Sequence, residues 1–334
     1  MKGESYMIVL YILLAALFVV LATSLVCFLK IFYASRREKW PEYPVPAGEI
    51  YEPHHAQMIE WIKLARSLPH TDVSIRSFDG LKLFGTYYEF QKGAPIDILF
   101  HGYHGCAEQD LSGGVYRCQK LGHNVLIVDH RAAGKSEGHV ITFGVNESRD
   151  AAAWVQYVVE NIDPDAKILL GGISMGAATV MMASAMELPP NVVGTVADCG
   201  YTSAKDIIKK VIRDMHLPDN LLYPFVRLGA RIFGGFDPDA NSPIASMPNC
   251  RVPVIFFHGD TDAFVPMSMS EENFAACGFF QKIQTAKESG LTAAGRTDDG
   301  DDLAAADLGG DTLQYLQVTE VFYQIFCTQN NISH

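Results

Sequence analysis

The sequence has few basic residues for its length, and it lacks the cysteine spacings of metal and disulfide scaffolds. Its 334 residues carry 26 Lys and Arg against 38 Asp and Glu, a formal net charge of −12. This balance argues against nucleic acid as a partner. The seven cysteines are scattered and include no CxxC pair. The sequence therefore indicates neither a zinc site nor a dense disulfide framework.

One stretch near the C-terminus lacks whole classes of residue. Residues 287–312, KESGLTAAGRTDDGDDLAAADLGGDT, contain no aromatic residue, no histidine, no valine and no isoleucine, and six of them are aspartates. Because no histidine accompanies the aspartates, they do not indicate a metal site. The composition is typical of a solvated or disordered segment.

The N-terminus, in contrast, is a long hydrophobic run. Met7–Leu29 contains no charged residue, and a helix of that length at about 1.5 Å per residue crosses the roughly 30 Å hydrocarbon core of a bilayer. We therefore predict a transmembrane anchor over residues 1–32, with residues 7–29 in the membrane. No clear signal-peptide cleavage site precedes Lys30. A buried helix of a soluble protein, the alternative, rarely runs this long without a charge.

The charges beside this run set the expected orientation. Lys30, Arg36, Arg37 and Lys39 follow it, whereas only Lys2 and the terminal amine precede it. The positive-inside rule then predicts a single-pass protein of the cell membrane whose large domain is cytoplasmic.

A β/α alternation begins after residues 33–70, which are expected to form a linker and a juxtamembrane helix. Two strand patterns flank Asp79-Gly80, a strong hairpin signal. Short apolar strands separated by helices then predict a mostly parallel sheet with helices on both faces. The expected strands are Ile96–Phe100, Asn124–Asp129, Lys167–Gly171, Val192–Ala197 and Val252–Phe257.

Residues 217–248 interrupt the alternation. They contain a short apolar helix and the run GGFDPDANSP, which indicates a small lid-like insertion over the strand ends. Its apolar residues would suit an apolar acyl or alcohol group of a substrate; equally, they could simply pack onto the domain. These residues are Leu221, Leu222, Tyr223, Phe225 and Phe233.

A G-x-S-x-G pattern at residues 172–176 stands between a buried strand and a helix. Gly172 and Gly176 allow a sharp turn, which lifts the hydroxyl of Ser174 clear of the sheet at a helix N-terminus. The pattern predicts Ser174 as a nucleophile. A helix N-cap serine, the alternative, would not explain both glycines.

Acyl transfer also requires two N–H groups that face the developing oxyanion. One is expected from the backbone of Met175, the residue after the nucleophile. The other is expected from the loop HGYHG at residues 101–105, from the backbone of Tyr103, with His101 and Gly102 shaping the loop. His104 is a less favoured alternative as a catalytic base.

A carboxylate follows the last readable strand, in the run HGDTDAFVP at residues 258–266. Active sites of open α/β sheets lie at the carboxyl ends of their strands. Asp262 is therefore expected to be the acid that orients a catalytic histidine, and Asp260 is expected to support the turn.

Several motifs together carry a family resemblance: the G-x-S-x-G turn, VDHRAAGKSEG at 128–138, ITFGVNESRDAAAWV at 141–155, ADCGYTS at 197–203 and HGDTDAFVP at 258–266. With them the chain resembles the α/β-hydrolase superfamily, and within it the bacterial membrane-anchored serine hydrolases related to the BEM46-like group. The resemblance implies an α/β-hydrolase domain over residues 71–327 with an eight-stranded, mostly parallel sheet. It also implies a triad in the order Ser, Asp, His, hydrolysis of carboxylic esters, and neither a metal nor an organic cofactor.

The family carries its catalytic histidine between the last strand and the last helix, but here no histidine lies between His258 and His334. The last strand is also unreadable, because residues 278–312 form an atypical acidic tract in its place. A last helix is expected at about Leu313–Phe326, with a tail over residues 328–334. Three explanations stay open: a natural pseudo-enzyme, a role for His334 at the frayed chain end, or a reading-frame error that is later restored.

The sequence thus predicts a serine hydrolase that acts on a small or lipid-like carboxylic ester through an acyl-enzyme at Ser174. The missing histidine is expected to impair it. A non-catalytic binding or scaffold protein on the same fold is the alternative, and a peptidase or thioesterase is less favoured. The oligomeric state is not readable from these residues.

Overall fold

The computed structural model describes residues 2–35, 41–48 and 51–277 of the chain. The strands are β1 (Thr71–Arg76), β2 (Lys82–Tyr88), β3 (Ile96–Phe100), β4 (Asn124–Val128), β5 (Ile168–Ile173), β6 (Val192–Asp198) and β7 (Val254–Phe257). The α-helices are α1 (Lys2–Ile31), α2 (His55–Ser67), α3 (Ala107–Leu121), α4 (Glu147–Asn161), α5 (Met175–Ser184), α6 (Ala204–Asp214), α7 (Asp219–Phe233), α8 (Pro243–Ser246) and α9 (Met267–Ala276). Short 3₁₀ turns lie at Glu52–His54 and Met247–Asn249.

Seven strands form one mixed sheet in the order β1-β2-β4-β3-β5-β6-β7. β1 and β2 form the predicted hairpin, and β2 pairs antiparallel with β4. From β4 to β7 every neighbouring pair is parallel, because helical crossovers join these strands. The carboxyl ends of β3, β5, β6 and β7 therefore meet at one edge, where open α/β sheets bind ligands.

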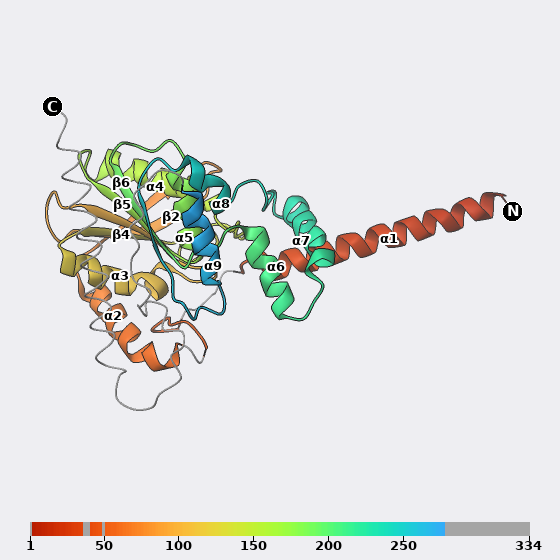
Figure 1. Cartoon of the computed structure of the whole chain (residues 1–334), viewed down its shortest axis with the longest axis horizontal. Coiled ribbons are helices and arrows are strands. Elements are labelled where there is room, and N and C mark those ends of the chain that lie inside the picture. Colours follow the sequence, from red (N-terminus) through yellow and green to blue (C-terminus); the bar gives the residue numbers. More distant parts are fainter. Residues whose placement is uncertain (1, 36–40, 49–50, 278–334) are drawn as a thin grey trace.

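Successive side chains of a strand point to opposite faces of the sheet, and here they enter an apolar layer on each face. Leu99 and Ile127 pack under α2 and α3 on one face. Ile98 and Leu126 pack against α4 and α5 on the other. Helices therefore cover both faces, as the sequence predicted, and Figure 1 shows this layering.

The expected elements are found with small shifts at their ends. The predicted strand Ile96–Phe100 has the observed bounds. The last parallel strand begins at Val254 and not at Val252, because the intervening Pro253 has no N–H to donate. The expected eighth strand, the acidic tract, the last helix and the tail lie outside the described residues.

The N-terminal helix α1 projects from the domain (Figure 1). Its stretch Glu4–Ile31 is long and apolar enough to cross a membrane. Its last turns, however, belong to the globular body. Phe28 and Phe32 are buried in one apolar cluster with α6 and α7, and Tyr33 makes a β-bridge with Val140. The division into an anchor, a linker and a hydrolase domain stays a prediction.

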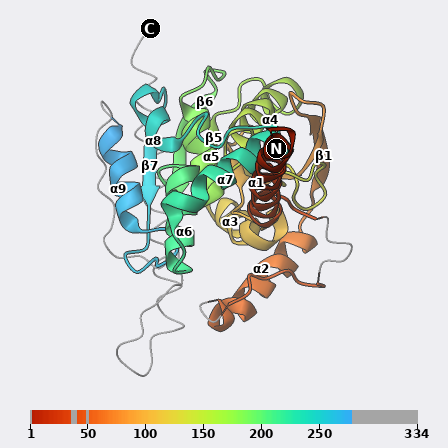
Figure 2. The same ribbon diagram turned by 90° about the vertical axis from the view of Figure 1, so that its right-hand side faces the viewer.

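Helices α7 and α8 lie within residues 217–248, where the insertion was expected, and α7 crosses beside the base of α1 in both views (Figures 1 and 2). Tyr223, Val226 and Ala230 of α7 are buried in the same cluster as Met175, at the start of α5. Leu221 of the same helix is exposed, whereas Phe233 packs on Phe28 of α1. Packing onto the domain thus explains the buried face of α7 and leaves Leu221 on an exposed face.

Candidate active site

The G-x-S-x-G turn joins β5 to α5 at Ser174, whose φ of 53° and ψ of −110° are rare for a residue with a side chain. Such a conformation costs about 1–3 kcal/mol and persists only where the surroundings impose it. The N–H of Ser174 donates to the Asp198 carbonyl at 2.8 Å, which ties the turn to β6. A side chain at Gly172 would overlap the backbone of Gly176, and one at Gly176 would overlap the carbonyl of Phe100. The two glycines are therefore required by packing, whereas the motif predicted them for the sharp turn.

The loop of residues 101–105 follows β3 and lies against the turn. A Cβ on Gly102 would come within 3.7 Å of the Ser174 Cβ, so the two backbones are neighbours. Within the described residues, neither the Tyr103 N–H nor the Met175 N–H donates a hydrogen bond. Met175 follows Ser174 directly and opens α5, whose N-terminus carries partial positive charge, and Tyr103 follows Gly102, whose backbone neighbours Ser174. Their role as oxyanion donors stays a prediction.

The Tyr103 side chain points away from the turn toward the anchor. Its hydroxyl donates to the Ile31 carbonyl at 2.7 Å, and its ring packs against Phe143 with 5.0 Å between centroids. Burial raises the pKa of Tyr103 to about 12, so the phenol stays protonated and can only act as a neutral donor or acceptor. The last turn of α1 therefore helps to fix the loop.

Asp110, in the first turn of α3, binds the loop of residues 101–105 through its carboxylate. Its carboxylate accepts from the Gly102 N–H at 2.9 Å and from the Gln109 side-chain amide at 3.0 Å. A Cβ on Gly105 would overlap the same carboxylate. Burial raises the pKa of Asp110, while His101 and the Gly102 N–H lower it. This residue was not predicted from the sequence, because an acid in a first helical turn is common and only the fold places it under the loop.

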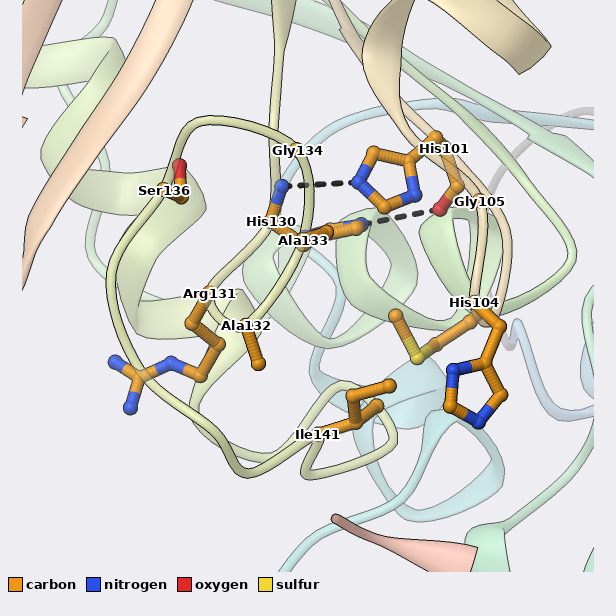
Figure 3. Close-up of a pocket in the computed structure, with 11 residues that line it drawn as sticks. His101, His104, Gly105, His130, Arg131, Ala132, Ala133, Gly134, Ser136 and Ile141 are labelled. Carbon is orange, nitrogen blue, oxygen red and sulfur yellow. Dashed lines mark hydrogen bonds between the residues drawn. The ribbon is translucent and has the colours of Figure 1, made fainter. Parts of the chain in front are cut away.

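Two buried histidines brace the same region, as Figure 3 shows. The Nε2 of His101 accepts from the His130 N–H at 3.0 Å, and the Nε2 of His130 lies 3.1 Å from the His101 carbonyl. The Nδ1 of His101 lies 2.7 Å from the Gly102 carbonyl. Burial lowers the pKa of His130, helped by His101. Both rings therefore serve the loop's structure, and the supporting role expected of His101 fits this arrangement.

A pocket lies beside the loop of residues 101–105, which we term the oxyanion loop after its predicted role (Figure 3). One wall is the segment after β4. Arg131 of this segment donates two hydrogen bonds to the Asp150 carboxylate, at 2.7 and 2.8 Å. Ser174 is not among the lining residues, so the pocket adjoins the turn and does not enclose it. The lining residues are His101, His104, Gly105, His130, Arg131, Ala132, Ala133, Gly134, Ser136, Ile141 and Met175.

Asp262 lies in the turn after β7, the next strand beyond β6. One carboxylate oxygen accepts from the N–H groups of Phe264 and Val265, at 2.8 and 2.9 Å. The other lies 3.6 Å from the Nε2 of His258. That ring is already engaged, since its Nε2 lies 2.7 Å from the Val265 carbonyl and its Nδ1 lies 2.6 Å from the Ser270 hydroxyl. Asp262 is thus a fixed, partly buried carboxylate at the catalytic edge, and His258 braces its turn.

The comparisons with known proteins agree with this geometry. Residues 98–241 match a family model described as the alpha/beta hydrolase fold. The chain is 29% identical over 152 residues to protein YqkD of Bacillus subtilis, covering 45% of this chain and 50% of YqkD. It is 25% identical over 196 residues to protein bem46 of Schizosaccharomyces pombe, covering 58% of this chain and 60% of bem46.

The chain has the α/β-hydrolase fold. A solved relative of this fold, the Pyrococcus furiosus esterase Pf2001, is 25% identical with a TM-score of 0.52 and covers 64% of this chain and 79% of the esterase. The likeness to bem46 confirms the BEM46-like resemblance. The chain spans about half the length of the curated relatives it matches.

In this α/β hydrolase a second carboxyl group lies near Asp262. Burial raises the pKa of Asp198, at the end of β6, to about 7, against the lowering effect of Arg117 and with a further rise from Asp262. Burial also raises the pKa of Tyr51, and Cys199, Asp110 and Asp262 add to that rise. Asp198 lies in the ADCGYTS motif, but the sequence did not single it out, because only the fold brings it beside Asp262.

Proposed function

We propose that this α/β hydrolase cleaves carboxylic esters through an acyl-enzyme formed at Ser174. The fold, and the likeness to an esterase, support hydrolase activity. The observation that carries the proposal is the strained Ser174 between β5 and α5, with two uncommitted N–H groups beside it.

The geometry suits the two half-reactions of ester hydrolysis. The Ser174 Oγ would attack the ester carbonyl carbon, and the carbonyl oxygen would become an oxyanion that accepts from the N–H groups of Tyr103 and Met175. Collapse of the tetrahedral intermediate breaks the bond to the alcohol, which leaves with a proton. Water then attacks the acyl-serine and releases the acid, regenerating the Ser174 hydroxyl.

The proton transfers in both steps need a base, and the histidine beside Asp262 is not free to serve. His258, beside Asp262, has both ring nitrogens engaged by Val265 and Ser270. Without a triad histidine, rate enhancement from the oxyanion hole and binding alone is about 10³–10⁴ over water. We therefore propose slow turnover, and small-molecule or lipid-like esters as substrates. The absence of any metal or organic cofactor from the reaction stays a prediction.

A non-catalytic binding protein on the same fold is the second candidate, and the engaged His258 ring favours it. The two candidates differ in whether Ser174 can become acylated. Because deacylation needs the same missing base, an acyl-enzyme should accumulate where the serine is active at all.

The test is to incubate the full chain in detergent with p-nitrophenyl butyrate and to locate the added acyl mass by peptide mass spectrometry. We expect acylation of Ser174, its loss in Ser174→Ala, and its retention in Ser67→Ala, a matched serine at the exposed end of α2. After subtraction of the release that imidazole catalyses without protein, exogenous imidazole should accelerate p-nitrophenol release in the wild-type chain and not in Ser174→Ala. The proposal would be overturned if Ser174 stayed unacylated and imidazole did not change p-nitrophenol release by the protein. A non-catalytic binding protein would then be the remaining candidate.

A further inference from the structure

One face of α7 is apolar, and it is exposed at Leu221 and Ile232 and half-buried at Phe225 and Leu228 between them. Leu221, Phe225, Leu228 and Ile232 recur at intervals of four, three and four residues, so they lie along one side of the helix and form what we term the outer stripe. Leu221 and Ile232 are 63% and 50% exposed. The turn before α7 adds Met215 and Leu217, which are 63% and 44% exposed. Contiguous exposed apolar side chains of this kind mark an interaction surface.

The other faces of α7 are already occupied. Tyr223, Val226 and Ala230 are buried in the core that also holds Met175. Arg227 lies on the polar side, where it pairs with Asp237 at 2.8 Å. The helix therefore has one face for the domain, one polar face, and the outer stripe directed away from the core.

The anchor leaves the domain next to this stripe. A Cβ on Gly229 would overlap the Ser24 carbonyl, so α1 and α7 cross in backbone contact. Phe28 of α1 packs on Phe233 of α7, with 6.0 Å between ring centroids. From Glu4 to Val19, by contrast, every side chain of α1 is exposed. Figures 1 and 2 show the free part of α1 pointing away from the domain, with α7 at its base.

The length of the free part places α7 at a definite depth. The uncharged segment from Met7 to Val19 is about 20 Å long at 1.5 Å per residue, whereas the hydrocarbon core of a bilayer is about 30 Å thick. About two more turns of α1 must therefore enter the membrane if the helix spans it. Those turns end near Val26 and so include Ser24, where α7 makes its backbone contact. The level of α7 is thus the boundary between hydrocarbon and headgroups.

We propose that α7 and the turn before it lie in the lipid interface, with the outer stripe and Met215 and Leu217 inserted among the acyl chains of the bilayer. An amphipathic helix in the plane of the interface has this arrangement of one apolar and one charged face. The buried face of α7 covers Met175, so the membrane surface would lie next to the candidate site. The proposal does not depend on whether the chain hydrolyses esters through Ser174.

The test uses the full chain in phosphatidylcholine vesicles whose acyl chains carry bromine, a short-range quencher of tryptophan fluorescence. Leu221→Trp and Ile232→Trp each add a reporter on the stripe, and Gln57→Trp adds one on an exposed face of α2, away from α1 (Figure 1). We expect quenching of the fluorescence added at 221 and 232, and none of that added at 57. Equal quenching at all three positions would overturn the proposal.

A second measurement needs no substitution. Phosphatidylcholine with a photoactivatable diazirine on its acyl chain is crosslinked to the wild-type chain, and the labelled peptides are mapped. Labelling of residues 215–233 together with α1, and not of α2, supports the proposal. Labelling of α1 alone would overturn it, as would crosslinks between the stripes of two copies, which would indicate self-association.

Discussion

At the residue scale, the candidate site depends on buried carboxylates that support backbone positions. Asp110 accepts the Gly102 N–H, which leaves the next N–H, that of Tyr103, available to a ligand. Asp262 is held in the same way, by two N–H groups of its own turn. These carboxylates orient backbone donors and turns, and an active site requires that orientation before any substrate arrives.

Asp198 leads to a prediction for pH. Burial raises its pKa from 3.8 to about 7, so between these values the folded state holds a proton that the unfolded state releases. Stability contributed by this proton is present below about pH 4 and is lost as pH rises through 7. In Asp198→Asn the side chain is uncharged at every pH, so this loss of folding stability at high pH does not occur. Thermal unfolding at pH 5 and pH 8 should show the variant gaining roughly 5 °C relative to wild type at the higher pH.

The matched control is Asp260→Asn, because Asp260 is an exposed carboxylate in the same region. Its melting temperature should follow that of the wild-type chain at both pH values. The prediction would be contradicted if the melting temperatures of wild type and Asp198→Asn changed equally between pH 5 and pH 8.

At the scale of elements, the joint between α1 and α7 connects the anchor to the site. Phe28 and Phe32 of the anchor share a cluster with Phe143 and Met175, and Ile31 accepts the Tyr103 hydroxyl. Movement of α1 relative to the domain would therefore disturb the oxyanion loop directly. The anchor acts here as part of the domain's packing as well as a candidate membrane span.

Gly229 provides the test of this joint. In an exposed helix interior, Gly→Ala stabilises by about 0.5–1 kcal/mol, but here the new Cβ would overlap the backbone carbonyl of Ser24, which cannot rotate away. We expect Gly229→Ala to destabilise by about 1–3 kcal/mol, measured by denaturant or thermal unfolding of the full chain in detergent. Gly113→Ala in α3 is the control, since its Cβ would meet only the Trp61 ring, at 3.0 Å. A gain in stability for both variants would mean that α1 and α7 are not closely packed.

At the scale of the whole molecule, the free part of α1, then α7, then the sheet follow one another along the long axis (Figure 1). The site then faces the side from which α1 leaves. β7 is the last strand of the described sheet, and the expected positions of the eighth strand and of a triad histidine fall in residues 278–334. Whether the chain is a slow enzyme or a binding protein is decided by the acylation experiment at Ser174.

The orientation of the molecule in the membrane is also a prediction at this scale. Lys30, Arg36, Arg37 and Lys39 follow the span, so we expect the domain on the cytoplasmic side. In a bacterial host, alkaline phosphatase fused after His334 should be inactive, because it matures only outside the cytoplasm, and green fluorescent protein fused there should fluoresce. Active phosphatase with a dark fluorescent fusion would place the domain outside.

The sequence by itself determined the elements and the chemistry of the turn. The strand period, the hairpin signal and the G-x-S-x-G spacing are local patterns, and each predicted its element because the physical cause lies within a few residues. Only the tertiary structure decided which distant groups meet. Asp110 beneath Gly102, Asp198 beside Asp262, and Ser24 against Gly229 each join residues from different elements. Such contacts leave no periodic trace in the chain, since they follow from how the layers pack and not from local backbone preference.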